Sequence, residues 1–168
     1  DIDRNGVMWA GTQSGHVASF DVRKCTAPLN GPEATGRHCP EGWQFWELPG
    51  PNFKDMQDVP GSVETSYYSW VDQHDTFGLG NDVPIIIGSA SGSLHMVAND
   101  EIATFVVPYP LGFFPKGVDG RIDNPNTGWK GRGLWTTSGH RTPAHMETGP
   151  GTRPKVYNFK LRPDPLAH

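Results

Sequence analysis

Near-copies of one short pattern, each centred on a tryptophan, lie close to the two ends of the chain. Residues 5–15 read NGVMWAGTQSG and residues 131–139 read GRGLWTTSG. Each copy has a Gly turn, apolar positions ending in Trp, small or hydroxylated residues and then Ser-Gly, and each precedes a second strand-like run, 16–22 or 155–161. Short repeats with a Gly and aromatic signature are typical of β-propeller blades. We therefore expect copies of one sheet-forming module.

The rest of the chain fits an all-β fold with long loops. Charged residues make up only 19% of the sequence, while 21 Gly and 16 Pro supply turns and six Trp and eight Phe supply apolar surface. No long amphipathic helical stretch is visible, and alternating apolar runs predict about ten strands. The expected strands are 7–12, 16–22, 43–48, 64–73, 84–89, 94–97, 102–107, 113–120, 134–138 and 155–161.

This number of strands is too small for a closed propeller. At about four strands per blade it gives about two to three blades, whereas closed rings have about four to eight. We expect an incomplete ring within a longer protein or complex, completed by remaining blades or by another subunit. The expected repeat units of this single propeller segment are 1–50, 64–110 and 113–163, followed by a tail at 164–168.

Charge and hydropathy exclude some classes of function. The net charge is -4 and no basic patch of the kind found in nucleic-acid-binding proteins is visible, so we expect no nucleic-acid partner. No apolar run is long enough to span a bilayer, so we expect no transmembrane segment. The sequence begins at Asp1 without Met or a signal-peptide pattern, which favours a processed or partial product.

The two cysteines, Cys25 and Cys39, lie in one Pro- and Gly-rich segment. A disulfide between them would close a short loop and stabilise the fold by about 3 kcal/mol. Free thiols are one alternative, and a metal pair with the neighbouring His38 is another, although structural zinc sites usually need four ligands. We expect the disulfide, which would indicate a periplasmic or extracellular protein.

The segment HRTPAHME at 140–147 contains the most suggestive set of chemical groups. The two imidazoles and the carboxylate of His140, His145 and Glu147 could hold a divalent metal with open coordination positions, as catalytic sites do. The alternative is a solvated loop with ordinary histidines, because loop ligands depend on tertiary support.

A second candidate metal site is the acidic segment 72–82. Asp72, Asp75 and Asp82, with intervening glycines, could bind calcium through oxygen ligands. The spacing does not match the Asp-x-Asp-x-Asp-Gly loop, and surface turns are often rich in Asp and Gly, so an ordinary turn is the alternative.

Most of the large aromatic side chains are expected in the core between blades. Trp43 and Trp46, beside the cysteine loop, are the exception: we expect them to be exposed, and they could form a platform for a sugar or a peptide.

The pattern Asp/Asn-Gly-x-x-Trp, then Gly, then a strand ending near Asp, is similar to the repeats of the virginiamycin B (streptogramin) lyase-like, or Vgb-like, β-propellers. Residues 5–9 and 15–21 carry the resemblance, as do Asp119-Gly120 followed by Leu134-Trp135-Thr136. Repeats of that family typically continue Trp-Phe-Thr-Glu, whereas here Trp9 and Trp135 are followed by runs without the acid. The resemblance therefore implies the fold and does not extend to a lyase centre within these blades.

The chain also resembles the C-terminal part of large secreted bacterial proteins that join such a propeller to a carboxypeptidase-regulatory-like domain. The segments that carry this resemblance are 36–43, 108–114, 128–135 and 153–157. That domain is an accessory module, so the resemblance implies no peptidase activity.

Two functions follow from these features. The first is a secreted or periplasmic binding or assembly module, which requires no catalytic group. The second is part of a metal-dependent lyase or hydrolase with its site on the propeller axis. The binding or assembly function requires neither of the two possible cofactors, a divalent metal or calcium.

Overall fold

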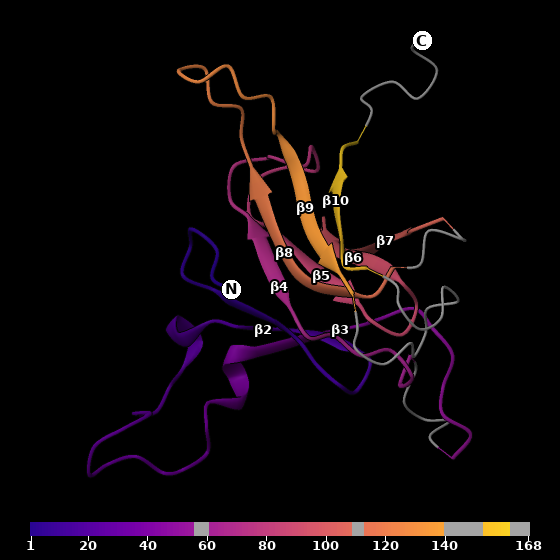
Figure 1. Ribbon diagram of the computed structural model, residues 1–168. Coiled ribbons are helices and arrows are strands. Elements are labelled where there is room, and N and C mark those ends of the chain that lie inside the picture. The colour runs from indigo at the N-terminus through magenta and orange to yellow at the C-terminus, as the bar shows by residue number, and fades with distance from the viewer. Residues whose placement is uncertain (56–60, 109–112, 140–152, 162–168) are drawn as a thin grey trace.

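A computed structural model of the protein describes residues 1–55, 61–108, 113–139 and 153–161. The described residues form an all-β fold of three antiparallel sheets, with no α-helix (Figure 1). Sheet A has the order β1-β2-β3, sheet B the order β4-β5-β6-β7 and sheet C the order β10-β9-β8. The strands are β1 (Met8–Gly11), β2 (His16–Phe20), β3 (Trp43–Glu47), β4 (Ser69–Asp72), β5 (Val83–Gly88), β6 (Ser93–Ala98), β7 (Glu101–Val106), β8 (Pro115–Arg121), β9 (Gly133–Ser138) and β10 (Lys155–Phe159), and two 3-10 turns, η1 (Val22–Lys24) and η2 (Pro40–Gly42), lie between β2 and β3.

Each sheet takes its strands from one continuous stretch of chain, 8–47, 69–106 or 115–159. Consecutive strands within a sheet pair with each other, as alternating runs separated by Gly-rich turns predict. All ten expected strands have a counterpart in the structure, usually within one to three residues at each end.

The largest difference lies before β4, where a strand over 64–73 was expected and only Ser69–Asp72 is regular. The N–H of Ile87 donates to the carbonyl of Tyr68, and the N–H of Ser89 donates to the carbonyl of Thr65. Two residues therefore lie between the acceptors Thr65 and Tyr68, but only one lies between the donors Ile87 and Ser89. This extra residue interrupts the ladder in the manner of a bulge.

Sheet B lies between the other two sheets, so both of its faces are buried. Ile86 of β5 packs with Val17 of β2 in the core between sheets A and B. Its neighbour Ile85 packs with Phe113 and Leu134 in the core between sheets B and C. Successive side chains of a strand point to opposite faces, and every residue of β5 is buried. The run Ile85-Ile86-Ile87 is therefore continuously apolar, because side chains on both faces of β5 are buried in a core.

The sheets also meet along one set of edges, formed by β1, β4 and β8. The β1 strand contacts β4, and β4 contacts β8; Figure 1 shows β4 beside β8. Ser69 Oγ donates to the carbonyl of Trp9 at 3.1 Å, which joins the edges of sheets A and B. At the other junction Gly120 of β8 lies against the ring of Trp70, where a Cβ atom would overlap the indole. Glycine at this position therefore allows the close approach of β4 and β8.

The two tryptophan strands have corresponding orientations. Trp9 of β1 packs into the core between sheets A and B, so it faces the next sheet. In β5 the corresponding side chain, Ile85, faces sheet C. In β9, Leu134 faces sheet B, so its neighbour Trp135 points to the opposite side. Trp9 and Ile85 thus face the following sheet, and Trp135 points to the corresponding side of sheet C, where the described residues contain no further sheet.

Candidate interaction surfaces

The open face of sheet A carries a ladder of aromatic rings. The rings of Phe20 and Trp43 lie 4.8 Å apart between centroids, and Trp43 stacks on Phe45 at 6.1 Å. His16 meets the edge of Phe45 at 6.2 Å. Although each ring contacts another, Phe45 is 58% exposed and Trp43 is 39% exposed. Large apolar rings exposed side by side are typical of surfaces that bind another molecule.

Trp46, the other member of the expected platform, lies on the opposite face of the sheet. Its ring packs against Trp9 at 5.0 Å, and its Nε1 donates to Asp100 Oδ1 at 2.9 Å. Strand residues three positions apart cannot share a face. Of the predicted pair, only Trp43 therefore lies on the open face, and its partner there is Phe45, two residues on, which the period of the strand identifies.

The open face of sheet C carries a second aromatic pair. Trp129, in the loop before β9, stacks on Trp135 with ring centroids 6.4 Å apart. The indole Nε1 of Trp135 donates to the carbonyl of Gly131 at 2.7 Å, which holds that loop against the strand. Beside these rings Val156 of β10 is 65% exposed. A hollow of about 300 Å³ runs along this face, lined by side chains of β8, β9 and β10 that include Trp135 and Val156.

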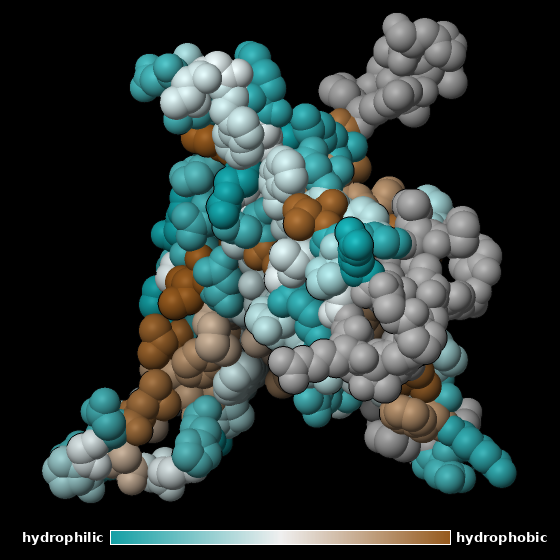
Figure 2. Space-filling model, in the orientation of Figure 1, coloured by the Kyte–Doolittle hydropathy of each residue, from teal (hydrophilic) through white to brown (hydrophobic). Residues whose placement is uncertain are grey.

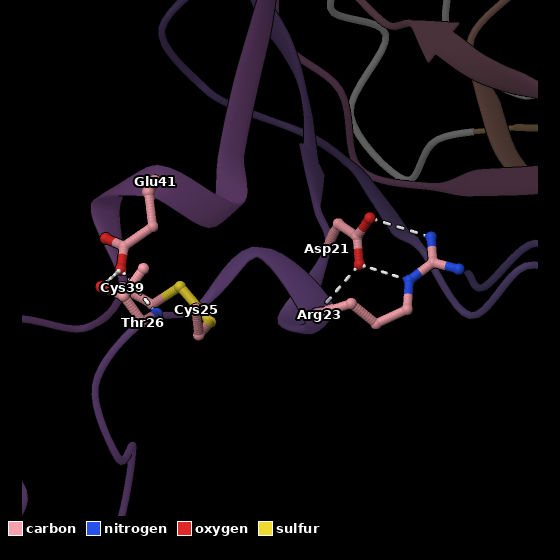
Figure 3. The surroundings of a disulfide bond; sticks show 6 residues. All are labelled: Asp21, Arg23, Cys25, Thr26, Cys39 and Glu41. Atoms are coloured by element: carbon pink, nitrogen blue, oxygen red, sulfur yellow. Dashed lines mark hydrogen bonds and ion pairs between the residues drawn. A yellow bond between two sulfur atoms is a disulfide. The ribbon is translucent and has the colours of Figure 1, made fainter.

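The cysteine loop extends from sheet A as a separate lobe, at the lower left of Figure 1. Cys25 and Cys39 form a disulfide, so this prediction is confirmed and neither the free-thiol nor the metal alternative applies. Figure 3 shows that Glu41 reaches back across the base of the loop to Thr26. The N–H and the hydroxyl of Thr26 both donate to Glu41 Oε1, at 2.9 and 2.6 Å.

Both carboxylates at the base of this loop are strong hydrogen-bond acceptors. The hydroxyl and the N–H of Thr26 lower the pKa of Glu41 to about 2. On the other side of the disulfide, Arg23 donates from Nε and Nη2 to the two oxygens of Asp21 at 2.8 Å each (Figure 3). These hydrogen bonds lower the pKa of Asp21 to about 2. The base of the loop is therefore held by the disulfide and by two ionised side chains.

The three carboxylates expected to bind calcium have separate partners. Asp72 is buried and accepts the N–H groups of Thr76 and Phe77 at 2.8 and 2.7 Å. Asp75 accepts the N–H of Gly80, and Asp82 forms an ion pair with Arg4. Within 1–55, 61–108, 113–139 and 153–161, no group of three or more His, Cys, Asp or Glu side chains is placed to hold a metal ion. The expected catalytic metal ligands His140, His145 and Glu147 lie outside the described residues.

A buried polar cluster in sheet B was not predicted from the sequence. His95 Nε2 lies 3.3 Å from Glu64 Oε2, and His95 Nδ1 lies 2.9 Å from Thr104 Oγ1. Glu64 Oε1 accepts the N–H groups of Thr65 and Ala90, at 3.1 and 2.9 Å. The Glu64 side chain is 2% exposed and that of His95 0% exposed.

The order hydroxyl, imidazole, carboxylate resembles that of hydrolases with a nucleophile, base and orienting acid. In this cluster, however, neither the imidazole nor the carboxylate reaches solvent, so a substrate has no access to the base. Burial raises the pKa of Glu64, but hydrogen bonds from His95, Ser91 and the Ala90 N–H outweigh it, and the net pKa is lowered. The cluster therefore connects the approach to β4, the β5–β6 turn, β6 and β7.

The described residues contain no helix that is long and apolar enough to cross a membrane. No protein-family model matches the chain, and the searches of curated proteins and of solved structures give no match.

Proposed function

We propose that the chain is a β-propeller segment that serves, outside the cytosol, as a binding or assembly module of a larger protein or complex. The observation that carries this proposal is the correspondence between Trp9 and Trp135. Sheet B covers Trp9, whereas Trp135 faces outward beside the exposed Trp129. The open face of sheet C is thus the counterpart of a face that sheet A buries against its neighbour.

The open face of sheet A supplies the complementary half of such a junction. Sheets B and C each bury the face that points toward the preceding sheet, through Ile86 of β5 and Leu134 of β9. The same face of sheet A presents Trp43 and Phe45 to solvent. A further sheet on each side would bury both aromatic surfaces, at a gain of about 25 cal/mol for each Å² of apolar area removed from water.

The arrangement of edges supports a common axis. The inner edges of the three sheets, formed by β1, β4 and β8, meet in order along one side of the stack, as the inner edges of propeller blades do. In the described residues β1 forms this edge although its counterparts are β5 and β9, because sheet A has three strands and sheet B has four. The resemblance to Vgb-like propellers is in keeping with this architecture. In this proposal the occupants of the two open faces are remaining blades, or another protein subunit with the same type of sheet.

The disulfide supports a location outside the cytosol, in the periplasm or the medium. Such bonds form and persist in oxidising compartments and are rare in the cytosol. Cys25 and Cys39 are bonded, and the described residues contain no free cysteine.

Hydroxyl-radical footprinting of the protein in its native particle and of the isolated chain tests the proposal. Trp135 and Phe45 should be protected in the native particle, because both lie on faces that the proposal covers. Phe53, which is 52% exposed and belongs to the segment between β3 and β4 rather than to a strand, is the control and should react equally in the two samples. Equal reactivity of Trp135 and Phe45 in both samples would contradict the proposal.

A further inference from the structure

A pocket rich in positive charge lies at one end of sheet C, and none of the aromatic rings of the two open faces lines it. It has a volume of about 470 Å³ and is formed by the β4–β5 loop, the β8–β9 loop and the residues after β10. These loops and the C-terminal end of β10 lie at the same end of the sheets in Figure 1. This volume is within the range of roughly 300–1,000 Å³ that is usual for small-molecule sites.

Three cationic side chains line this pocket, Lys130, Arg132 and Lys160, against the single carboxylate of Asp123. This excess of positive charge is a local feature, because the whole chain has a net charge of -4. Within the described part of the chain neither lysine forms an ion pair with a carboxylate. Their ammonium groups are therefore not neutralised by these neighbours.

The guanidinium of Arg132 is oriented by neutral groups. Its Nη2 donates to the carbonyl of Asp75 at 2.7 Å and its Nε to the carbonyl of Thr76 at 3.4 Å. Its backbone N–H donates to Asp123 Oδ1 at 2.9 Å. Carbonyl partners orient the guanidinium without cancelling its charge, and the group has more N–H donors than the two carbonyls accept. The remaining N–H groups of the guanidinium are thus held in place and available to an anionic acceptor.

Part of the lining is apolar. Phe77 belongs to the core between sheets B and C and is 4% exposed, so it forms a fixed wall. Leu161 lines the same pocket from the residues after β10. A ligand there would contact hydrocarbon on one side and cationic groups on the other. Pockets with mostly apolar walls and a few oriented polar groups are typical of sites for small organic ligands.

We propose that this pocket binds a small organic anion, a carboxylate or phosphate group on an apolar or aromatic body. The anionic group would contact Lys130, Arg132 and Lys160, and the apolar body would lie against Phe77 and Leu161. Neither Trp129 nor Trp135 lines the pocket, so binding of the anion requires no contact with the aromatic rings that the proposed function covers.

Titrations of the ¹⁵N-labelled protein followed by NMR test this proposal, with phenyl phosphate, benzoate, inorganic phosphate and benzyl alcohol as probes. We expect phenyl phosphate or benzoate to give saturable shifts of the Thr76, Phe77 and Gly133 amides. Inorganic phosphate lacks the apolar body and benzyl alcohol lacks the charge, so both should bind more weakly. The stronger of the first two probes identifies the anionic group.

The variants Lys130→Gln and Lys160→Gln keep long side chains and remove the charges. Each should weaken binding of the preferred anion about tenfold, and the double variant more. Lys24→Gln, on η1 and outside the pocket lining, is the matched control and should leave the affinity unchanged. The proposal is overturned if no anion shifts these amides, if the double variant binds as well as the wild type, or if benzyl alcohol binds as tightly as benzoate.

Discussion

Replacing Glu64 by alanine, and separately by glutamine, tests whether the buried cluster of sheet B joins its strands. Glu64 Oε1 accepts two backbone N–H groups, and Oε2 faces His95 Nε2. Glu64→Ala leaves both amides and the imidazole without this acceptor. A buried donor without a partner costs about 1–3 kcal/mol, and the two amides are partly buried, so we expect a loss of about 3–4 kcal/mol in the free energy of unfolding.

Glu64→Gln separates the shape of the side chain from its charge. Because both amides bind the same oxygen, the glutamine carbonyl can accept both, and its NH₂ group can donate to His95 Nε2 when the imidazole proton is on Nδ1. That tautomer lets Nδ1 donate to Thr104 Oγ1. We therefore expect Glu64→Gln to cost only about 1 kcal/mol, because the hydrogen bonds are kept and only their charge assistance is lost.

Urea unfolding followed by tryptophan fluorescence, near neutral pH, measures the free energy of unfolding of both variants. Glu47→Ala is the matched control, since Glu47 is exposed on β3 and surface substitutions usually change stability by no more than about 0.5 kcal/mol. A loss below about 1 kcal/mol for Glu64→Ala, or equal losses for the alanine and glutamine variants, would refute the assigned role of the carboxylate.

The pH dependence gives a second test of the same residue. The pKa of Glu64 in the folded protein is lowered from its ordinary value of 4.5. Between the two pKa values the unfolded chain binds more protons than the folded one, so stability rises with pH. The contribution of Glu64 is therefore complete above its ordinary pKa and is lost as the pH falls through its folded pKa. The stability difference between wild type and Glu64→Gln should shrink over that interval.

Three further predictions concern the disulfide, a close contact and the metal ligands. The double variant Cys25→Ser/Cys39→Ser should lose about 3 kcal/mol in the free energy of unfolding measured with urea, because the bond closes a short loop; no loss would show that the bond does not constrain the unfolded chain. Gly120→Val should destabilise the protein by about 1–3 kcal/mol through overlap with Trp70, whereas Gly36→Ala, with no atom near its added Cβ, should cost less than about 1.5 kcal/mol; the reverse order would exclude a close β4–β8 junction. Metal analysis of the native protein and of His140→Ala and His145→Ala should show no stoichiometric metal in any sample if the chain is a binding module, and metal lost in the variants would favour the lyase or hydrolase alternative.

The sequence predicts the positions of the strands well, because apolar alternation and Gly turns are local signals. The strand before Asp72 was expected to begin at Glu64, but Glu64 instead turns toward Ala90 and His95. Those partners are 26 and 31 residues away, and no local pattern reports them. A buried acidic side chain is tolerated at position 64 because of hydrogen bonds that exist only after the sheet has formed.

The interaction surfaces were partly accessible from the sequence. The exposure of Trp43 follows from its place beside the cysteine loop, and strict alternation would also have separated it from Trp46. The cationic pocket could not be found in this way. The three cationic side chains come from two segments, the β8–β9 loop and the residues after β10, which are separated by β9 and β10. A third segment of the lining, the loop that contains Thr76, connects two strands of sheet B.

The loop between Cys25 and Cys39 has a consequence for how the protein could diversify. Its ends are fixed with their Cα atoms 5.3 Å apart, and nearly every residue between them is exposed. Figure 2 shows this lobe projecting at the lower left, with hydrophobic and hydrophilic residues intermixed. Lengthening a loop whose ends are fixed adds little entropic cost. New peptide sequences could therefore be grafted between the cysteines while β2 and β3 keep their register, which makes this lobe a natural display scaffold.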